Sequence, residues 1–430
     1  MRTSNSLALA LTVALAAPVA HAQQSGPQTP ALDTTTFVVL GEGLAAGMSD
    51  FGLRDVGQRF SFPALVARQI GAPFPQPLIQ GPGIGDVFGQ AKQPVVMPRL
   101  PQNQVRAFPA QPNPNDDAPA LFVFNLSVPG MKLADSASRR PVSPLIHDRD
   151  MYQTSINLIL GFPSLILERD VPLWTQLEYA KAMTPTAALV ALGYHEVLEA
   201  AVNGDPALIP TAATFRQNYT NVVKQLRDQQ VQVIATTIPD PMDTAYVTPV
   251  LRATEGLLAA PPFVLLLGYN LRQDDLITRP GIYTIGTQLF RRAIEPLPPG
   301  SILSAATGRD ITARVRALNT EIANVARENG AVLYDLYAFT NRVRAGGVRA
   351  GNRTLTANYL GGFYSLDGYY PGSTGHALIA NEILGLLNRT YGRSFPLVDL
   401  GPVMREDAAL EHRLAPAATL SAAELGFSEQ

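Results

Sequence analysis

The chain has 430 residues, of which 46% are hydrophobic, so it can bury a sizeable core in one large domain or in two. Its formal net charge of −2 gives no electrostatic case for binding nucleic acid or an anionic membrane surface. It contains no cysteine, which excludes disulfides, thiolate chemistry and cysteine-ligated metals.

The first 22 residues have the three-part pattern of a secretory signal peptide. Arg2 supplies the positive end, residues 7–18 form an apolar stretch, and Ala20-His21-Ala22 provides a small-x-small cleavage site. The apolar stretch is too short to cross a bilayer, and no later apolar run is long enough to do so. We therefore expect an exported protein, periplasmic or secreted, that is cleaved after Ala22 and has no integral membrane segment.

Five apolar runs, each followed by a turn signal, are predicted to form strands. They cover residues 36–40, 121–126, 187–192, 231–238 and 331–334. The runs are apolar on both faces and alternate with segments of helical periodicity at 215–226, 311–325 and 373–387, the last of which Ser373 can cap. This alternation predicts an α/β protein, a three-layer α/β/α sandwich with a flavodoxin-like, five-stranded parallel sheet.

Two long stretches interrupt the alternation. Residues 71–119 are dense in Pro, Gly, Gln and Asn, and residues 240–304 mix polar turns with apolar patches. Loops of this length in a compact domain are either functional covers or disordered. We therefore predict one domain over residues 23–400 with long loop insertions at 71–119 and 240–304, followed by a mobile C-terminal tail at 401–430.

Four loops are candidates for the edge of the sheet where ligands bind, outside the C-terminal ends of the strands. They read GEGL at 41–44, NLSVPG at 125–130, GYHE at 193–196 and SLDGYYP at 365–371. In order and spacing they resemble the signature blocks of the SGNH/GDSL hydrolases, an ester-cleaving family with a Ser-His-Asp triad, whose blocks read GDSL, NLGVPG, GxND and DGxHP. The flanking segments at 61–69 and 361–383 are similar to one exported bacterial branch of that family.

The resemblance covers most of the chain after residue 22, but the catalytic machinery that it implies is incomplete. Gly43 stands where the family has its nucleophilic Ser. Tyr370 stands where the family has its general base, and a phenol of pKa about 10 does not accept a proton at neutral pH. Asp367, which would orient the base, is retained. His195 replaces the oxyanion Asn, and Glu196 replaces the Asp beside it and is expected at the ligand pocket.

Other residues of the four loops keep parts of the expected site. The backbone N–H groups of Gly43 and Ser127 could still form part of an oxyanion hole, and the Ser127 hydroxyl is a weaker candidate for a replacement nucleophile. Glu42, Gly130 and Gly193 are expected to line the ligand pocket. We predict no cofactor and no metal, because isolated His–Glu groups are more often hydrogen-bonded structure than metal sites.

Three functions remain open. Loss of a triad Ser or His costs about 10⁶ in kcat in subtilisin, so we favour a catalytically impaired family member that binds an acyl-ester or glycan ligand. The second hypothesis is an active esterase or lipase in which His195, with Asp367 or Glu42, activates water. The third is a non-enzymatic interaction protein whose long insertions form the working surface; no protein partner is indicated.

Overall fold

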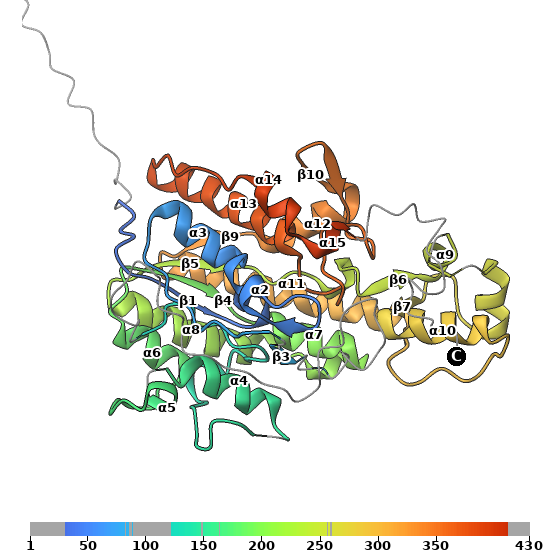
Figure 1. The fold of residues 1–430 in the computed structure, drawn as a ribbon, viewed down its shortest axis with the longest axis horizontal. Coiled ribbons are helices and arrows are strands. Elements are labelled where there is room, and N and C mark those ends of the chain that lie inside the picture. The colour runs from blue at the N-terminus through green and yellow to red at the C-terminus, as the bar shows by residue number, and fades with distance from the viewer. Residues whose placement is uncertain are drawn as a thin grey trace, which may run out of the picture.

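The computed structural model describes residues 31–81, 83–85, 88, 122–147, 149–162, 164–255, 257–258 and 260–411. The predicted signal peptide, most of the predicted 71–119 insertion and residues 412–430 therefore lie outside the described residues. The described chain forms a main domain around a parallel sheet and a smaller subdomain that projects from it (Figure 1). None of the helices in the described ranges combines the length and the apolar character needed to cross a membrane.

A four-stranded parallel sheet lies at the centre of the main domain. In spatial order its strands are β1 (Phe37–Gly41), β4 (Ala187–Ala191), β5 (Gln232–Thr236) and β9 (Val332–Tyr334). Every residue of β1 and β4 is buried, as their unbroken apolar character predicts for strands covered on both faces. Four of the five predicted strands are thus confirmed, each within two residues of its predicted ends.

The prediction of a strand at 121–126, and with it of a fifth strand, is wrong. Only Asn125 forms a parallel bridge, to Val39 of β1, and the N–H of Val39 donates to the carbonyl oxygen of Phe124 at 2.9 Å. The side chain of Asn125 accepts the N–H of Ser127 at 3.2 Å, which makes a local turn in place of further regular pairing. The segment therefore lies along the outer side of β1 without becoming part of the sheet.

Helices cover both faces of the sheet (Figure 1). On one face α3 (Phe62–Ile70) packs against α13 (Ser373–Tyr391). On the other lie α6 (Gln176–Ala182), α7 (Tyr194–Asn203) and α8 (Ala212–Asp228), and α11 (Ala305–Glu328) packs against α7 and α8. The predicted helical segments at 215–226, 311–325 and 373–387 fall within α8, α11 and α13.

The other helices of the main domain are α1 (Gly43–Ala46), α2 (Asp55–Arg59), α4 (Met151–Leu160), α5 (Ser164–Leu167), α12 (Leu336–Gly346), α14 (Leu400–Arg405) and α15 (Ala408–Glu411), with 3₁₀ turns at Asp135–Ala137, Pro206–Leu208 and Pro241–Asp243. Two short antiparallel pairs complete it, β2 (Gly52–Leu53) with β3 (Ile84–Gly85) and β10 (Val348–Ala350) with β11 (Arg353–Leu355).

The start of the last helix is capped from a distance. Ser373 is already the first residue of α13, so the prediction that it caps this helix is wrong. Instead, Oδ2 of Asp407 accepts the N–H of Thr374 at 2.7 Å. Asp407 and the neighbouring Leu410 are both buried. Residues 401–411 therefore pack onto the domain through a capping carboxylate and an apolar contact, and do not begin a mobile tail.

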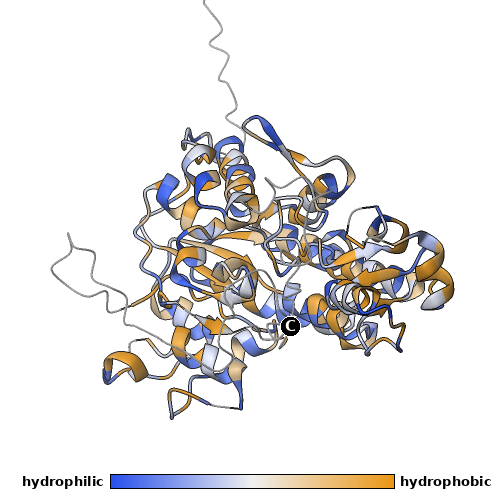
Figure 2. Cartoon of the chain, turned by 45° about the vertical axis from the view of Figure 1, so that its right-hand side comes forward, coloured by the Kyte–Doolittle hydropathy of each residue, from blue (hydrophilic) through white to orange (hydrophobic). Residues whose placement is uncertain are grey.

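The insertion at 240–304 contains a folded subdomain, so the prediction of a long loop there is wrong. Its elements are β6 (Val247–Pro249), α9 (Val250–Ala253), the π-helix η5 (Val264–Gly268), β7 (Leu276–Thr278), α10 (Arg279–Phe290) and β8 (Ile302–Leu303). The three strands pair in an antiparallel sheet. Six buried side chains give the subdomain a small core of its own: Val250, Ala253, Leu258, Leu265, Ile277 and Ile285. Figure 2 shows the hydrophobic residues along these helices and strands.

Candidate functional site

The four candidate loops meet at the C-terminal edge of the sheet. The N–H of Val128 donates to the carbonyl oxygen of Gly41, the last residue of β1, at 3.2 Å. Across the same edge, Oη of Tyr194 donates to the carbonyl oxygen of Tyr369 at 2.8 Å. Segments that are more than 150 residues apart in sequence, such as those of Tyr194 and Tyr369, are thus in direct contact where an open parallel sheet binds its ligands.

Gly43 and Tyr370 occupy one space. Gly43 is the first residue of α1, and a Cβ atom built on it would lie 2.8 Å from Cζ of Tyr370 and 3.0 Å from Sδ of Met48, with Oη of Tyr370 closer still. Both Gly43 and Tyr370 are buried. The phenol therefore fills the volume that any side chain at position 43 would need.

Asp367 holds the turn that presents this phenol. Its Oδ1 accepts the backbone N–H groups of Tyr369 and Tyr370, both at 2.9 Å. The carboxyl group is fully buried, and this burial raises its pKa to about 7, although the two hydrogen bonds oppose the rise. Asp367 thus orients the backbone of its own loop, where the family resemblance would have it orient an imidazole.

The two expected oxyanion donors are engaged by the protein itself. Oε1 of Glu42 accepts the N–H of Leu44 at 3.1 Å as the N-cap of α1, and a backbone hydrogen bond from Gly43 also favours its charged form. The N–H of Ser127 donates to Oδ1 of Asn125. Both groups are therefore turned toward protein oxygens, whereas an oxyanion hole needs them free to bind the reacting carbonyl.

Burial, with a smaller contribution from the neighbouring carboxyl group of Glu196, raises the pKa of Glu42 to about 8. Glu196 is itself buried, and its pKa is raised to about 7 although its Oε1 accepts the N–H of Leu133 at 2.7 Å. The second oxygen of each carboxyl group has no hydrogen-bond partner among the described residues. At neutral pH Glu42 is therefore largely protonated, which lessens the repulsion between the two groups.

His195 lies in an apolar setting. Its ring stacks on that of Phe88, with centroids 5.1 Å apart and an interplanar angle of 16°. Burial, with a smaller contribution from Lys132, lowers its pKa to about 3, so the imidazole is neutral. Within the described residues it forms no hydrogen bond with Asp367 or Glu42, the two partners expected for an activated water.

The two glycines expected at the pocket have backbone roles. Gly130, with φ of +86°, is the third residue of a tight turn that the N–H of Met131 closes onto the carbonyl oxygen of Val128 at 3.0 Å. Gly193 precedes α7 with φ of +108°, and a Cβ on it would lie 2.7 Å from Cδ1 of Ile238. Both positions need glycine for the path of the chain.

Aromatic rings close the space over the strand ends. Tyr369 lies at the centre of this group, with ring centroids 5.0 Å from Tyr370, 5.7 Å from Tyr246 and 5.7 Å from Phe88. Tyr194 contacts Tyr370 edge-on at 6.1 Å. The four tyrosines are buried, so the described part of this edge is packed with side chains.

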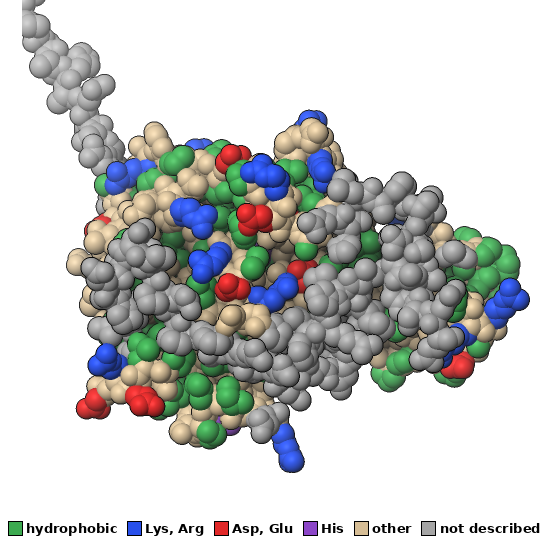
Figure 3. All heavy atoms as spheres, in the orientation of Figure 1, with side chains coloured by type: hydrophobic (Ala, Val, Ile, Leu, Met, Phe, Trp, Pro, Cys, Tyr) green, Lys and Arg blue, Asp and Glu red, His purple; other side chains and the backbone are tan. Residues whose placement is uncertain are grey.

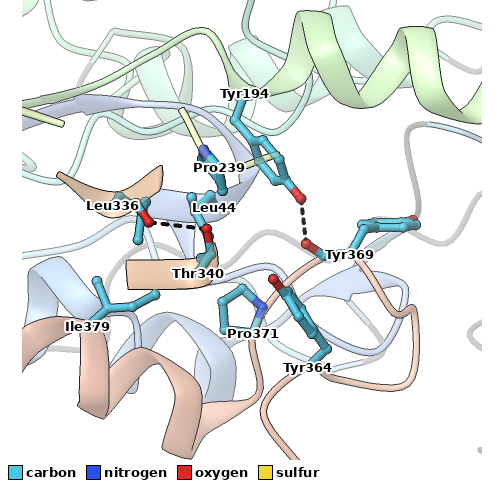
Figure 4. Close-up of a pocket in the computed structure, with 9 residues that line it drawn as sticks. All are labelled: Leu44, Tyr194, Pro239, Leu336, Thr340, Tyr364, Tyr369, Pro371 and Ile379. Carbon is cyan, nitrogen blue, oxygen red and sulfur yellow. Dashed lines mark hydrogen bonds between the residues drawn. The ribbon is translucent and has the colours of Figure 1, made fainter. Parts of the chain in front are cut away.

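Figure 4 shows a small cavity beside these rings. Its lining is mostly apolar and aromatic, from Leu44, Tyr194, Pro239, Leu336, Thr340, Tyr364, Tyr369, Pro371 and Ile379. Its volume of about 10 Å³ is at the lower limit for one water molecule and is far below that of a substrate pocket. The buried hydroxyl of Tyr364, which has no hydrogen-bond partner among the described residues, is a suitable contact for such a water.

Gln176 is a site residue that the sequence did not indicate. From α6 its Nε2 donates to the carbonyl oxygens of Gly41 and Leu126, both at 2.8 Å. It therefore ties the end of β1 to the loop that follows the bridged segment. A lone Gln on a helix carries no motif, so no sequence pattern could have placed it here.

The described residues contain no group of three or more His, Asp or Glu side chains that could hold a metal ion. The sequence matches no protein-family model, and no curated protein is significantly similar to it. One solved structure, from Parabacteroides merdae and provisionally described as a GDSL-like lipase, aligns with 85% of this chain and 99% of its own at 11% identity and a TM-score of 0.34. At that TM-score the likeness carries no argument about fold or function.

Proposed function

We propose that this protein is a catalytically impaired relative of the SGNH/GDSL hydrolases, which binds an acyl-ester or glycan ligand without hydrolysing it. One observation carries the proposal: the phenol of Tyr370 fills the space in which a side chain at Gly43 would stand. The nucleophile and base positions of the resemblance are thus adjacent, as members of a triad must be, but neither carries the required group.

The surrounding groups support the same proposal. Glu42 and Asn125 take up backbone N–H groups that would otherwise stabilise an oxyanion. Asp367 binds backbone amides rather than a base. Loss of a triad Ser or His in subtilisin lowers kcat about 10⁶-fold, and the residual catalysis of those variants depends on intact oxyanion donors. We therefore expect hydrolysis of activated esters to be indistinguishable from the uncatalysed rate.

The test is an assay of the purified chain with short-chain nitrophenyl esters, together with labelling by a serine-directed phosphonate. We expect neither turnover nor labelling. The matched variant is Gly43→Ser/Tyr370→His/His195→Asn, which restores the family residues at the nucleophile, base and oxyanion positions. Labelling of this variant alone would support the correspondence of the loops.

The esterase hypothesis makes the opposite prediction for one substitution. If His195 activates water, the wild-type chain hydrolyses the esters and His195→Ala abolishes the activity, with the phosphonate still unable to label either protein. That result would contradict the proposed loss of catalysis. A ligand screen by thermal shift, with acylated lipids and acetylated oligosaccharides against their deacylated forms, tests the binding half of the proposal separately.

A further inference from the structure

The outer end of the subdomain exposes several large apolar side chains. Leu267 is 80% exposed, Phe263 61%, Phe290 60% and Ile294 53%. These four residues, the apolar tip, come from η5 and the residue before it, and from the end of α10 and the turn after it. Single exposed apolar residues are normal, but a group at one end of a small subdomain marks a binding surface. Figure 3 shows hydrophobic side chains gathered there.

The segments that carry the apolar tip are packed together. A Cβ built on Gly268 would lie 2.8 Å from Cδ1 of Ile294, so η5 contacts the segment after α10. Leu265 of η5 and Ile285 of α10 are fully buried in the core of the subdomain. The tip therefore stands on a packed base, which gives its exposed side chains fixed positions.

Two arginines border the apolar tip. Arg291 and Arg292 follow Phe290 directly, are exposed, and form no ion pair with another described residue. Between residues 290 and 295 the only acidic side chain is Glu295, so this stretch is locally positive although the whole chain has a net charge of −2. Exposed apolar side chains beside unpaired arginines complement a surface that has an apolar interior and anionic headgroups.

We propose that the apolar tip inserts into the surface of a lipid bilayer, with Arg291 and Arg292 at the level of the headgroups. The subdomain projects away from the main domain (Figure 1), so the tip can reach a flat surface without obstruction by the sheet and its helices. A second copy of this chain is a less suitable partner for the apolar tip than a lipid bilayer. A symmetric contact between two tips would bring the arginine pairs together, and four apolar residues are far fewer than the roughly 20–30 residues a side of a stable interface.

The test is co-sedimentation of the full chain with large vesicles of phosphatidylcholine, with and without phosphatidylglycerol. We expect binding, and tighter binding to the vesicles that contain phosphatidylglycerol. Phe263→Ser/Leu267→Ser should lower the partition coefficient at least about tenfold, because both side chains would lose their apolar environment. Arg291→Gln/Arg292→Gln should remove the preference for phosphatidylglycerol.

The control is Leu397→Ser, which removes a side chain of the main domain that is 56% exposed and should leave vesicle binding unchanged. All substituted side chains are exposed, so the fold should persist, and circular dichroism verifies this. The proposal is overturned if the wild-type chain binds neither type of vesicle, or if the Phe263 and Leu267 variant binds as well as Leu397→Ser. It is also overturned if the tip substitutions abolish only a concentration-dependent self-association in the ultracentrifuge.

Discussion

Adding one methyl group at Gly43 measures how tightly Tyr370 fills the space beside position 43. In Gly43→Ala the new Cβ would lie 2.8 Å from Cζ of Tyr370 and 3.0 Å from Sδ of Met48. Overpacking of a tight core by such a group costs about 1–3 kcal/mol. Gly43 is the first residue of a helix and has a negative φ, which alanine can also adopt. The substitution therefore also lowers the conformational entropy of the unfolded chain, which offsets at most about 1 kcal/mol of the destabilisation. We expect a net destabilisation of about 1–2 kcal/mol.

The cost should depend on residue 370. Tyr370→His shortens the side chain and removes the two Tyr370 atoms that a Cβ at position 43 would meet, which leaves only the flexible side chain of Met48 in contact, so Gly43→Ala should then be close to neutral. Urea unfolding of the four proteins in this double-mutant cycle gives the coupling energy, which we expect to exceed about 1 kcal/mol. Gly346→Ala, on α12 with open space around its Cβ, is the control. Additivity within about 0.5 kcal/mol would refute the shared volume.

Three further outcomes follow from the same edge of the sheet. Gln176→Leu should cost about 1–3 kcal/mol in urea unfolding, because it leaves the carbonyl oxygen of Leu126 buried without a donor, while that of Gly41 keeps the N–H of Val128. Since the folded pKa of Glu42 is about 8 against an ordinary 4.5, the folded chain binds more protons between those values, and stability should fall as pH rises through them by roughly 1 kcal/mol per pH unit. Glu42→Gln should flatten that fall; an unchanged slope would contradict the assignment. Gly193→Ala should cost at least about 1 kcal/mol in thermal unfolding, because φ at this position is +108°.

The clearest correct strand predictions are those in which the apolar run is buried on both faces of the sheet. The runs at 36–40 and 187–192 became β1 and β4 because their residues fit between two helical layers. The run at 121–126 has a similar pattern but lies at the edge, where Asn125 turns its own backbone. Apolar content cannot distinguish these cases, because edge pairing depends on partners that are distant in sequence.

The candidate loops were found because their residues are contiguous, and the structure brings them into contact. What surrounds them could not be found in this way. Gln176 reaches the site from a helix, and Tyr246 arrives from the insertion that was expected to be a loop. Both act through contacts between remote segments, which leave no local pattern. The folded insertion was missed for the same reason, since its small core combines apolar residues from several short elements.

The adjacency of Gly43 and Tyr370 changes how the two substitutions should be understood. If the two positions were independent in packing, Gly43→Ser and Tyr370→His would each be harmless to the fold. Since a Cβ at position 43 would meet the ring of Tyr370, Gly43→Ser alone must displace a buried phenol, whereas Tyr370→His alone leaves unfilled space beside Gly43. The two positions are thus coupled by packing, because the side chain of Tyr370 fits only if residue 43 has no side chain. A test of the proposed function by restoring a nucleophile and a base therefore has to change both positions together.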